Sequence, residues 1–175
     1  MKNIMIIDDD KMNLATARKV LSDTYKVIPV LRGSQALTYL ENGDCDMILL
    51  DINMPEMDGF EVLKKIRQMD HCKDTPVIFL TADNDSETET RCFQEGAIDF
   101  IAKPFVPEVM RSRIGRALEL EILRSSLAER LEQKTREVFD MKNKSCQDAL
   151  TGLWNRAYTE ETVNEMVSQG VRVPC

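Results

Sequence analysis

Short apolar runs alternate with longer amphipathic segments through the N-terminal part of the chain. The runs are rich in Ile, Val, Leu and Phe, and they predict buried strands at residues 3–7, 26–30, 47–51, 77–81 and 98–101. Helical periodicity between them predicts helices at residues 11–21, 34–41, 58–69 and 86–95. Strands that alternate with helices indicate the α/β fold class, here a doubly wound five-stranded parallel sheet with helices on both faces.

After Pro107 the pattern changes to one long C-terminal helix over residues 107–146, which would extend for about 60 Å. Its apolar residues recur at alternating spacings of three and four, at Ala117, Leu120, Leu127, Leu131, Val138 and Met141. Arg124 and Lys134 interrupt this seam. We predict a coiled-coil linker that joins two chains into a homodimer through residues 110–146. The alternatives are a helix that folds back on its own domain and a charged linker.

Polar residues stand where the predicted strands end. Asp8 and Asp9 follow the first strand, Asp51 closes the third, Thr81 closes the fourth, and Lys103 follows the fifth. Open parallel sheets bind ligands at the carboxyl ends of their strands, so we expect these side chains to meet. Capping of the next helix would explain Asp10, but it would leave the other positions without a reason.

The chemistry of such a cluster points to a phosphoryl group. Neighbouring carboxylates repel each other by about 4 kcal/mol per close pair at an effective dielectric constant of about 20, so they need a cation. Oxygen ligands without His or Cys select Mg²⁺. Asp51 is then the candidate nucleophile, and Lys103 and Thr81 are candidates to hold phosphoryl oxygens.

The same residues lie in IMIIDDD, MILLDINMPEMDG, VIFLTA and FIAKPF, and residues 1–120 resemble the flavodoxin-like receiver domain of two-component response regulators. The resemblance implies that Asp51 accepts a phosphoryl group from a sensor histidine kinase or phosphotransfer protein. It implies that the cofactor Mg²⁺ is bound by Asp8, Asp9, Asp51 and the backbone carbonyl of Asn53. Thr81 and Lys103 would contact the phosphoryl group, and Thr81 with Phe100 would form the switch. Pro104 would follow a cis peptide bond.

The segment DALTGLWNRAYTEE, residues 148–161, resembles the start of a GGDEF diguanylate cyclase domain. The matching residues are Asp148, Leu150, Thr151, Gly152, Leu153, Asn155 and Arg156, whereas Ala157 replaces the usual second Arg. No G-G-[DE]-E-F sequence occurs in the chain. We therefore expect residues 147–175 to be an incomplete N-terminal fragment of that domain and the chain as given not to be an enzyme. The alternative is a chance turn anchored by Trp154.

Composition and charge narrow the classes of function and partner that remain. The chain has 175 residues and a net charge of −7, and no basic patch follows the receiver-like part, so we expect no nucleic-acid partner. No apolar run approaches the roughly 20 residues of a membrane span, and no signal peptide precedes the first strand, so we expect a cytoplasmic protein without a membrane partner. The function predicted is a phosphoacceptor that controls dimerisation and, in a full-length parent, cyclic di-GMP synthesis. The alternative is a stand-alone interaction module that regulates a partner protein.

Overall fold

The computed structural model describes residues 1–82 and 86–146, and the side chains as far as Met141. The chain divides into two units, Met1–Leu123 and Arg124–Cys175. The predicted GGDEF-like fragment, residues 147–175, lies outside the described residues.

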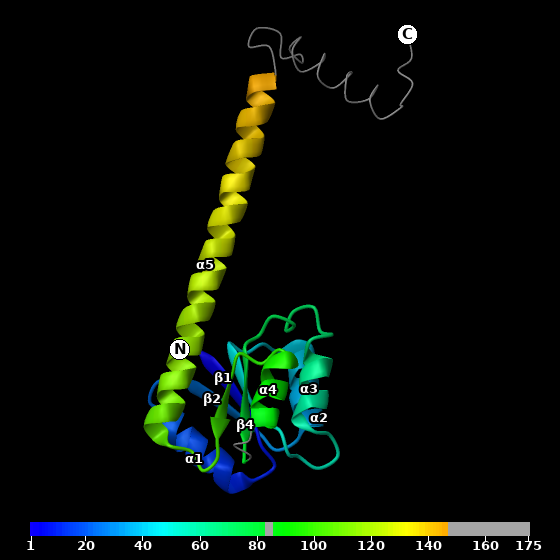
Figure 1. The fold of residues 1–175 in the computed structure, drawn as a ribbon, viewed down its shortest axis with the longest axis vertical. Helices are drawn as coiled ribbons and strands as arrows, with labels where there is room; N and C mark the ends of the chain where they lie inside the picture. Colours follow the sequence, from blue (N-terminus) through cyan, green and yellow to red (C-terminus); the bar gives the residue numbers. More distant parts are fainter. Residues whose placement is uncertain (83–85, 147–175) are drawn as a thin grey trace. The chain divides into compact units, whose positions relative to one another are not determined.

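In the described residues, five strands alternate with five helices (Figure 1). The strands are β1 (Asn3–Ile7), β2 (Lys26–Val30), β3 (Met47–Asp51), β4 (Val77–Thr81) and β5 (Asp99–Ala102). The helices are α1 (Lys11–Leu21), α2 (Gly33–Asn42), α3 (Gly59–Ile66), α4 (Ser86–Gln94) and α5 (Pro107–Cys146). The predicted order of elements is confirmed.

The strands form one parallel sheet in the order β2-β1-β3-β4-β5. The chain order reverses at β1, and β1 and β3 lie next to each other, which places a topological switch point between their carboxyl ends. This is the predicted doubly wound α/β fold, and it brings the residues after β1 and the end of β3 to one edge of the sheet.

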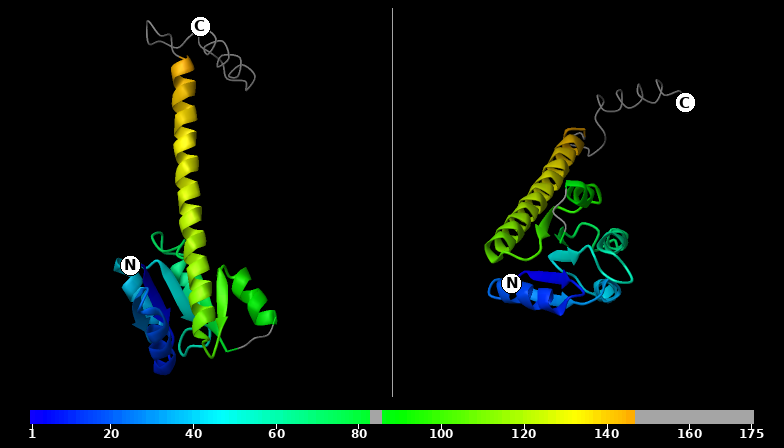
Figure 2. Two further views of the ribbon diagram at one scale, coloured as in Figure 1. Left: turned by 90° about the vertical axis from the view of Figure 1, so that its left-hand side faces the viewer. Right: turned by 60° about the horizontal axis from the view of Figure 1, so that its bottom comes forward.

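Two hydrophobic cores lie on opposite faces of the sheet, because alternate residues of each strand point to opposite sides. One core joins strand residues such as Ile7 and Leu50 to α2, α3 and α4. The other joins strand residues such as Ile6 and Leu49 to α1 and to Met110 and Ile114 of α5. Figure 2 shows α1 and the first turns of α5 on one face and the other helices across the sheet.

Helices α1 and α3 begin directly after residues whose side chains cap them. Asp10 caps α1, with its Oδ1 accepting from the Met12 N–H at 2.8 Å, as predicted. Asp58 and Glu61 form a capping box at the start of α3. This helix ends at Ile66, three residues before the predicted end, and the chain continues in tighter turns from Gln68 and Met69 to the carbonyls of Lys65 and Ile66.

Helix α5 changes character along its length. Met110, Ile114, Ala117 and Leu118 are buried against the sheet, so Ala117 belongs to the domain core rather than to the exposed seam. The later apolar residues are exposed: Leu120, Leu127, Leu131, Val138 and Met141. Within the described residues, no helix is long and apolar enough to cross a membrane.

Candidate functional site

The edge formed by the strand ends gathers the predicted acidic residues. Asp8 directly follows β1 and is fully buried, and Asp51 closes β3 and is 3% exposed. Asp9 is exposed beside them. One carboxylate oxygen of each of the three lies within 4.8 Å of the others. The structure thus brings together three carboxylates that are widely separated in the sequence.

Lys103 lies between two of these acids. Its Nζ is 2.8 Å from Asp8 Oδ2 and 2.8 Å from Asp51 Oδ2, and its side chain is only 15% exposed. The Lys103 N–H also donates to the Thr81 carbonyl at 2.7 Å, which fixes the chain after β5 against the end of β4. The Lys103–Pro104 peptide bond is cis, as predicted. Thr81 is 1% exposed and closes β4 at the same edge.

Asp8 uses its two carboxylate oxygens differently. Oδ1 accepts from the Asp10 N–H at 2.9 Å and from the Asn13 side-chain amide at 3.2 Å. Oδ2 has Lys103 as an ion-pair partner but makes no hydrogen bond of standard geometry. Sequence reasoning missed Asn13, since an Asn in the first turn of a helix carries no signal of its own without the position of Asp8.

The donor set fits a hard divalent cation. Asp8, Asp9 and Asp51 supply carboxylate oxygens, which Mg²⁺ prefers, and one oxygen of the buried Asp8 lacks a hydrogen bond. Asn53 lies two residues beyond Asp51, and its N–H is 3.4 Å from Asp51 Oδ1. The roles of these residues as ligands, including that of the Asn53 carbonyl, remain predictions.

Burial raises the pKa of Asp51, and the charge of Asp8 adds to this effect, whereas Lys103 only partly offsets it. For Lys103 burial acts to lower the pKa, but its contacts with Asp51 and Asp8 outweigh burial and hold the pKa above its usual value. The lysine therefore stays charged at neutral pH and partly compensates an otherwise uncompensated pair of buried acids.

The backbone of α3 approaches Asp51 closely. A Cβ atom on Gly59 would lie 2.3 Å from the Asp51 carbonyl oxygen, a separation that no side chain tolerates. The Gly59 N–H donates to the Ile52 carbonyl at 2.9 Å. The glycine of the MPEMDG segment thus lets the helix start directly against the strand that carries the candidate nucleophile.

Phe100, the predicted switch aromatic, contacts side chains of two helices. Its ring centroid is 6.0 Å from that of Phe93 on α4, in an edge-to-face arrangement. The guanidinium carbon of Arg113 on α5 is 5.4 Å from the Phe100 centroid. The switch role of Phe100 remains a prediction, but its contacts connect β5 to both helices.

A doubly wound parallel sheet that gathers acids and a lysine at its carboxyl edge defines a class of α/β proteins whose ligand site lies at that edge. The particular family follows from comparison: residues 4–115 match the response regulator receiver domain. The chain belongs to this family, and the predicted receiver fold is confirmed.

Two related bacterial proteins carry names that refer to cyclic di-GMP. A probable cyclic di-GMP phosphodiesterase of Vibrio cholerae is 37% identical over 116 residues, which cover 66% of this chain and 26% of that protein. The cyclic di-GMP phosphodiesterase response regulator RpfG of Xanthomonas campestris is 33% identical, over 75% of this chain and 36% of that protein. The chain thus spans about a quarter to a third of these two relatives.

Solved structures show the same fold. The chemotaxis protein CheY4 of Vibrio cholerae is 30% identical with a TM-score of 0.64, and the match covers 67% of this chain and 98% of that one. The receiver domain of a sensor histidine kinase from Pseudomonas aeruginosa, solved with a magnesium ion in its active-site cleft, is 28% identical with a TM-score of 0.62. That match also covers 67% of this chain and 98% of that one.

Proposed function

We propose that this protein accepts a phosphoryl group on Asp51 from a sensor histidine kinase or phosphotransfer protein. The observation that carries the proposal is the position of Lys103, whose Nζ lies 2.8 Å from both Asp8 and Asp51. A single buried ammonium shared by two acids is suited to release one of them to a cation and to take up a phosphoryl oxygen instead.

In this proposal an Asp51 carboxylate oxygen attacks the phosphorus of a phosphohistidine. A P–O bond forms as the N–P bond breaks, and the imidazole nitrogen of the donor leaves with the electron pair and is then protonated from solvent. Lys103 and the Thr81 hydroxyl hold two phosphoryl oxygens. Asp8, Asp9, Asp51 and the Asn53 carbonyl would hold Mg²⁺, which when bound would neutralise charge at the transferring group.

The test uses acetyl phosphate as the phosphoryl donor and intact-mass spectrometry as the readout. We expect one phosphoryl group per chain when Mg²⁺ is present and none when it is chelated. Asp51→Asn should abolish the modification. Asp46→Asn is the matched control, because Asp46 pairs with Lys2 outside the site and should leave phosphorylation unchanged. Undiminished phosphorylation of Asp51→Asn would refute the proposal.

We further propose that phosphorylation alters self-association through α5, whose apolar residues from Leu120 onward are exposed. In a full-length parent this would control cyclic di-GMP synthesis. The GGDEF-like sequence at residues 148–161 and the cyclic di-GMP relatives support that output, although the names of those relatives refer to phosphodiesterases. The chain as given should form no cyclic di-GMP from GTP, and detection of that product would contradict the assignment of residues 147–175 as a fragment.

A second candidate is a stand-alone module that binds a partner through α5. The exposed apolar residues of α5 favour it equally, since they would serve a hetero-association as well as a homodimer. The two candidates are distinguished by mixing this chain with a full-length cyclase, each carrying a different tag. Co-purification of the unlike copies supports the module, whereas exclusive homodimers support the first candidate.

A further inference from the structure

The Phe100 ring is held from two sides by side chains that belong to different helices. Phe93 of α4 meets it edge to face, and Arg113 of α5 places its guanidinium 5.4 Å from the ring centroid. A guanidinium within about 6 Å of a ring centroid is attracted by the electrons of the ring face. The position that Phe100 occupies is therefore stabilised by a contact that depends on the ring staying between α4 and α5.

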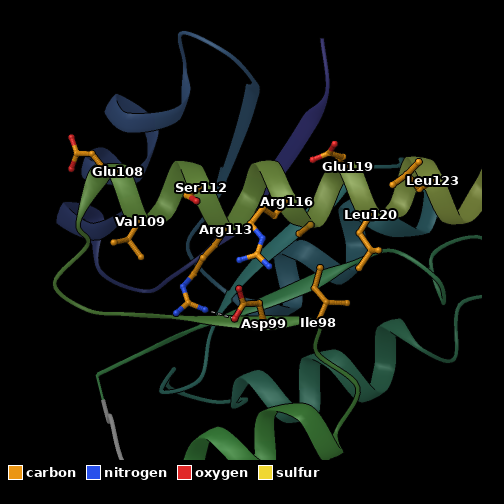
Figure 3. A pocket seen from close by; sticks show the side chains of 11 residues that line it. Ile98, Asp99, Glu108, Val109, Ser112, Arg113, Arg116, Glu119, Leu120 and Leu123 are labelled. Atoms are coloured by element: carbon orange, nitrogen blue, oxygen red, sulfur yellow. Dashed lines mark hydrogen bonds and ion pairs between the residues drawn. The ribbon is translucent and has the colours of Figure 1, made fainter.

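Asp99 holds the Arg113 side chain in its place beside the ring. The Arg113 guanidinium pairs with Asp99 Oδ1, and the same oxygen accepts the Phe100 N–H at 2.9 Å. Figure 3 shows the Arg113–Asp99 pair as α5 passes over the start of β5. This partly exposed ion pair contributes little stability by itself, so its consequence is mainly geometric.

We propose that Arg113 is a positioning residue that retains the Phe100 ring between α4 and α5 and thereby favours the unphosphorylated state of the receiver. The inference rests on the proposed phosphorylation of Asp51. The switch predicted for Thr81 and Phe100 would have the ring leave this position and turn toward the end of β4 when Asp51 is phosphorylated. A ring that turns in this way loses the guanidinium, so the contact stabilises only the state in which the ring stays beside Arg113. By linkage, any contact made in one state alone shifts the population toward that state.

The same side chain ties the ring to the helix that carries the exposed apolar residues. Arg113 and Asp99 line a groove together with Ile98, Leu120 and Leu123, as Figure 3 shows. When the ring leaves, Arg113 loses one of its two contacts on β5 and its guanidinium can reorient in this groove. The position of one ring on β5 is thus coupled through one arginine to the surface around Leu120.

The test compares the unaltered 175-residue chain with Arg113→Gln, which removes the cation and keeps a long polar side chain. Arg113→Lys keeps a cation, and Asp99→Asn weakens the anchor. Arg111→Gln is the matched control, because Arg111 also lies on α5 but donates to the Val20 carbonyl, away from Phe100. Beryllofluoride with Mg²⁺ serves as the probe for the phosphorylated state, and its affinity is measured by isothermal titration calorimetry.

Arg113→Gln should bind beryllofluoride about two- to five-fold more tightly, the change expected from the loss of one exposed cation–ring contact. Asp99→Asn should change the affinity in the same direction but less, and Arg113→Lys and Arg111→Gln should stay close to the parent. A second readout uses 4-fluorophenylalanine labelling, with the Phe100 signal assigned by Phe100→Leu. Without beryllofluoride, the ¹⁹F resonance of Phe100 in Arg113→Gln should move toward its beryllofluoride-bound position.

Two failures are distinguishable. If the parent binds no beryllofluoride, the proposed phosphorylation of Asp51 fails. The Phe100 resonances of the unliganded parent and Arg113→Gln can still be compared, and identical resonances would refute the positioning of the ring by Arg113. If the parent binds beryllofluoride while Arg113→Gln matches it in affinity and in the Phe100 resonance, only the role of Arg113 is refuted. Weaker binding by Arg113→Gln would refute it as well, since the arginine would then favour the phosphorylated state.

Discussion

At the scale of residues, the hydrogen bonds of Asp8 suit the role proposed for it as a cation ligand. Its Oδ1 is held by the Asp10 N–H and the Asn13 amide, which leaves Oδ2 for the ion pair with Lys103. Partners that hold the free oxygen of a metal-binding carboxylate fix its orientation, and their removal commonly lowers metal affinity by a factor of about 10 or more. We therefore expect substitution of Asn13, which lies outside the acidic cluster, to lower the affinity for Mg²⁺.

Asn13→Ala should weaken Mg²⁺ binding by about tenfold without unfolding the domain, because Asp8 loses one of its two donors. Isothermal titration calorimetry with MgCl₂ measures the effect. Thr16→Ala is the control, since Thr16 lies on the same helix and bonds only the Met12 carbonyl. Equal Mg²⁺ affinity for Asn13→Ala and the parent would show that Asp8 needs no such support.

The raised pKa of Asp51 makes a prediction about stability and pH. A carboxyl group whose pKa is higher in the folded than in the unfolded state, as for Asp51, stabilises the fold at low pH. This contribution to stability is lost as the pH rises through the folded-state pKa. Burial is the main cause of the raised pKa, so ionisation of Asp51 lowers the stability of the metal-free protein.

Asp51→Asn should therefore be more stable than the parent in EDTA at neutral pH, and the difference should shrink as the pH falls below the folded pKa of Asp51. Urea unfolding followed by circular dichroism at several pH values measures this. Saturating Mg²⁺ should reverse the order, because only the parent keeps all three carboxylates. A parent that is the more stable protein in EDTA at every pH would contradict the argument.

At the scale of elements, the close approach of α3 to β3 decides where Asp51 lies. Gly59 opens α3 directly after its cap Asp58, and only a residue without Cβ fits against the Asp51 carbonyl. The approach of α3 to β3, the strand that ends at Asp51, thus depends on one glycine and one capping box.

Gly59→Ala should lower the free energy of unfolding by about 1–3 kcal/mol, the usual cost of forcing extra atoms into a packed site. It should also slow phosphorylation by acetyl phosphate, because relief of the 2.3 Å contact requires α3 or the end of β3 to move. Gly115→Ala is the control, since nothing lies within 4 Å of the added Cβ and the helix should gain stability. Unchanged unfolding and phosphorylation in Gly59→Ala would show that the chain relaxes without cost.

The sequence predicts this level of structure well where one local signal suffices. Apolar runs locate all five strands, and the polar residues that end them locate the acidic cluster, because parallel strands must end at one edge. The end of α3 is less predictable. Arg67 follows α3 and donates to the carbonyls of Lys73, Thr75 and Gly96. These contacts with the following loop and with a distant turn cannot be predicted from the local sequence.

Contacts between side chains of different elements are the part that the sequence does not reveal. Asn13 near Asp8 and Arg113 near Phe100 are ordinary helix residues until the fold sets their neighbours. The heptad pattern shows the same limit: Ala117 fits the seam by spacing, yet it is buried in the receiver core. Spacing states which residues share a face of a helix but not what covers that face.

At the scale of the whole molecule, α5 is part of the receiver core at one end and exposes apolar residues beyond it. Leu127 and Leu131 are 60% and 61% exposed, and they lie one helical turn apart on the seam. Intrahelical pairs such as Lys134–Glu137 and Arg136–Glu132 stabilise the helix only slightly in water. Burial of the apolar residues against a second copy would contribute much more, at about 1.5–3 kcal/mol for each large side chain fully buried.

Leu127→Asp combined with Leu131→Asp should therefore weaken the proposed dimer by at least about 100-fold, since two apolar contacts are lost from each chain. Sedimentation velocity over a range of concentrations measures the association. Ser125→Asp combined with Ser126→Asp is the matched control, because it adds the same charge to the same helix off the seam. Both double variants should still bind beryllofluoride in the presence of Mg²⁺, since neither alters the acidic site. If the Leu double variant associates as strongly as the Ser double variant, α5 is not the main contact between chains, and the surface that joins them lies on the receiver domain itself.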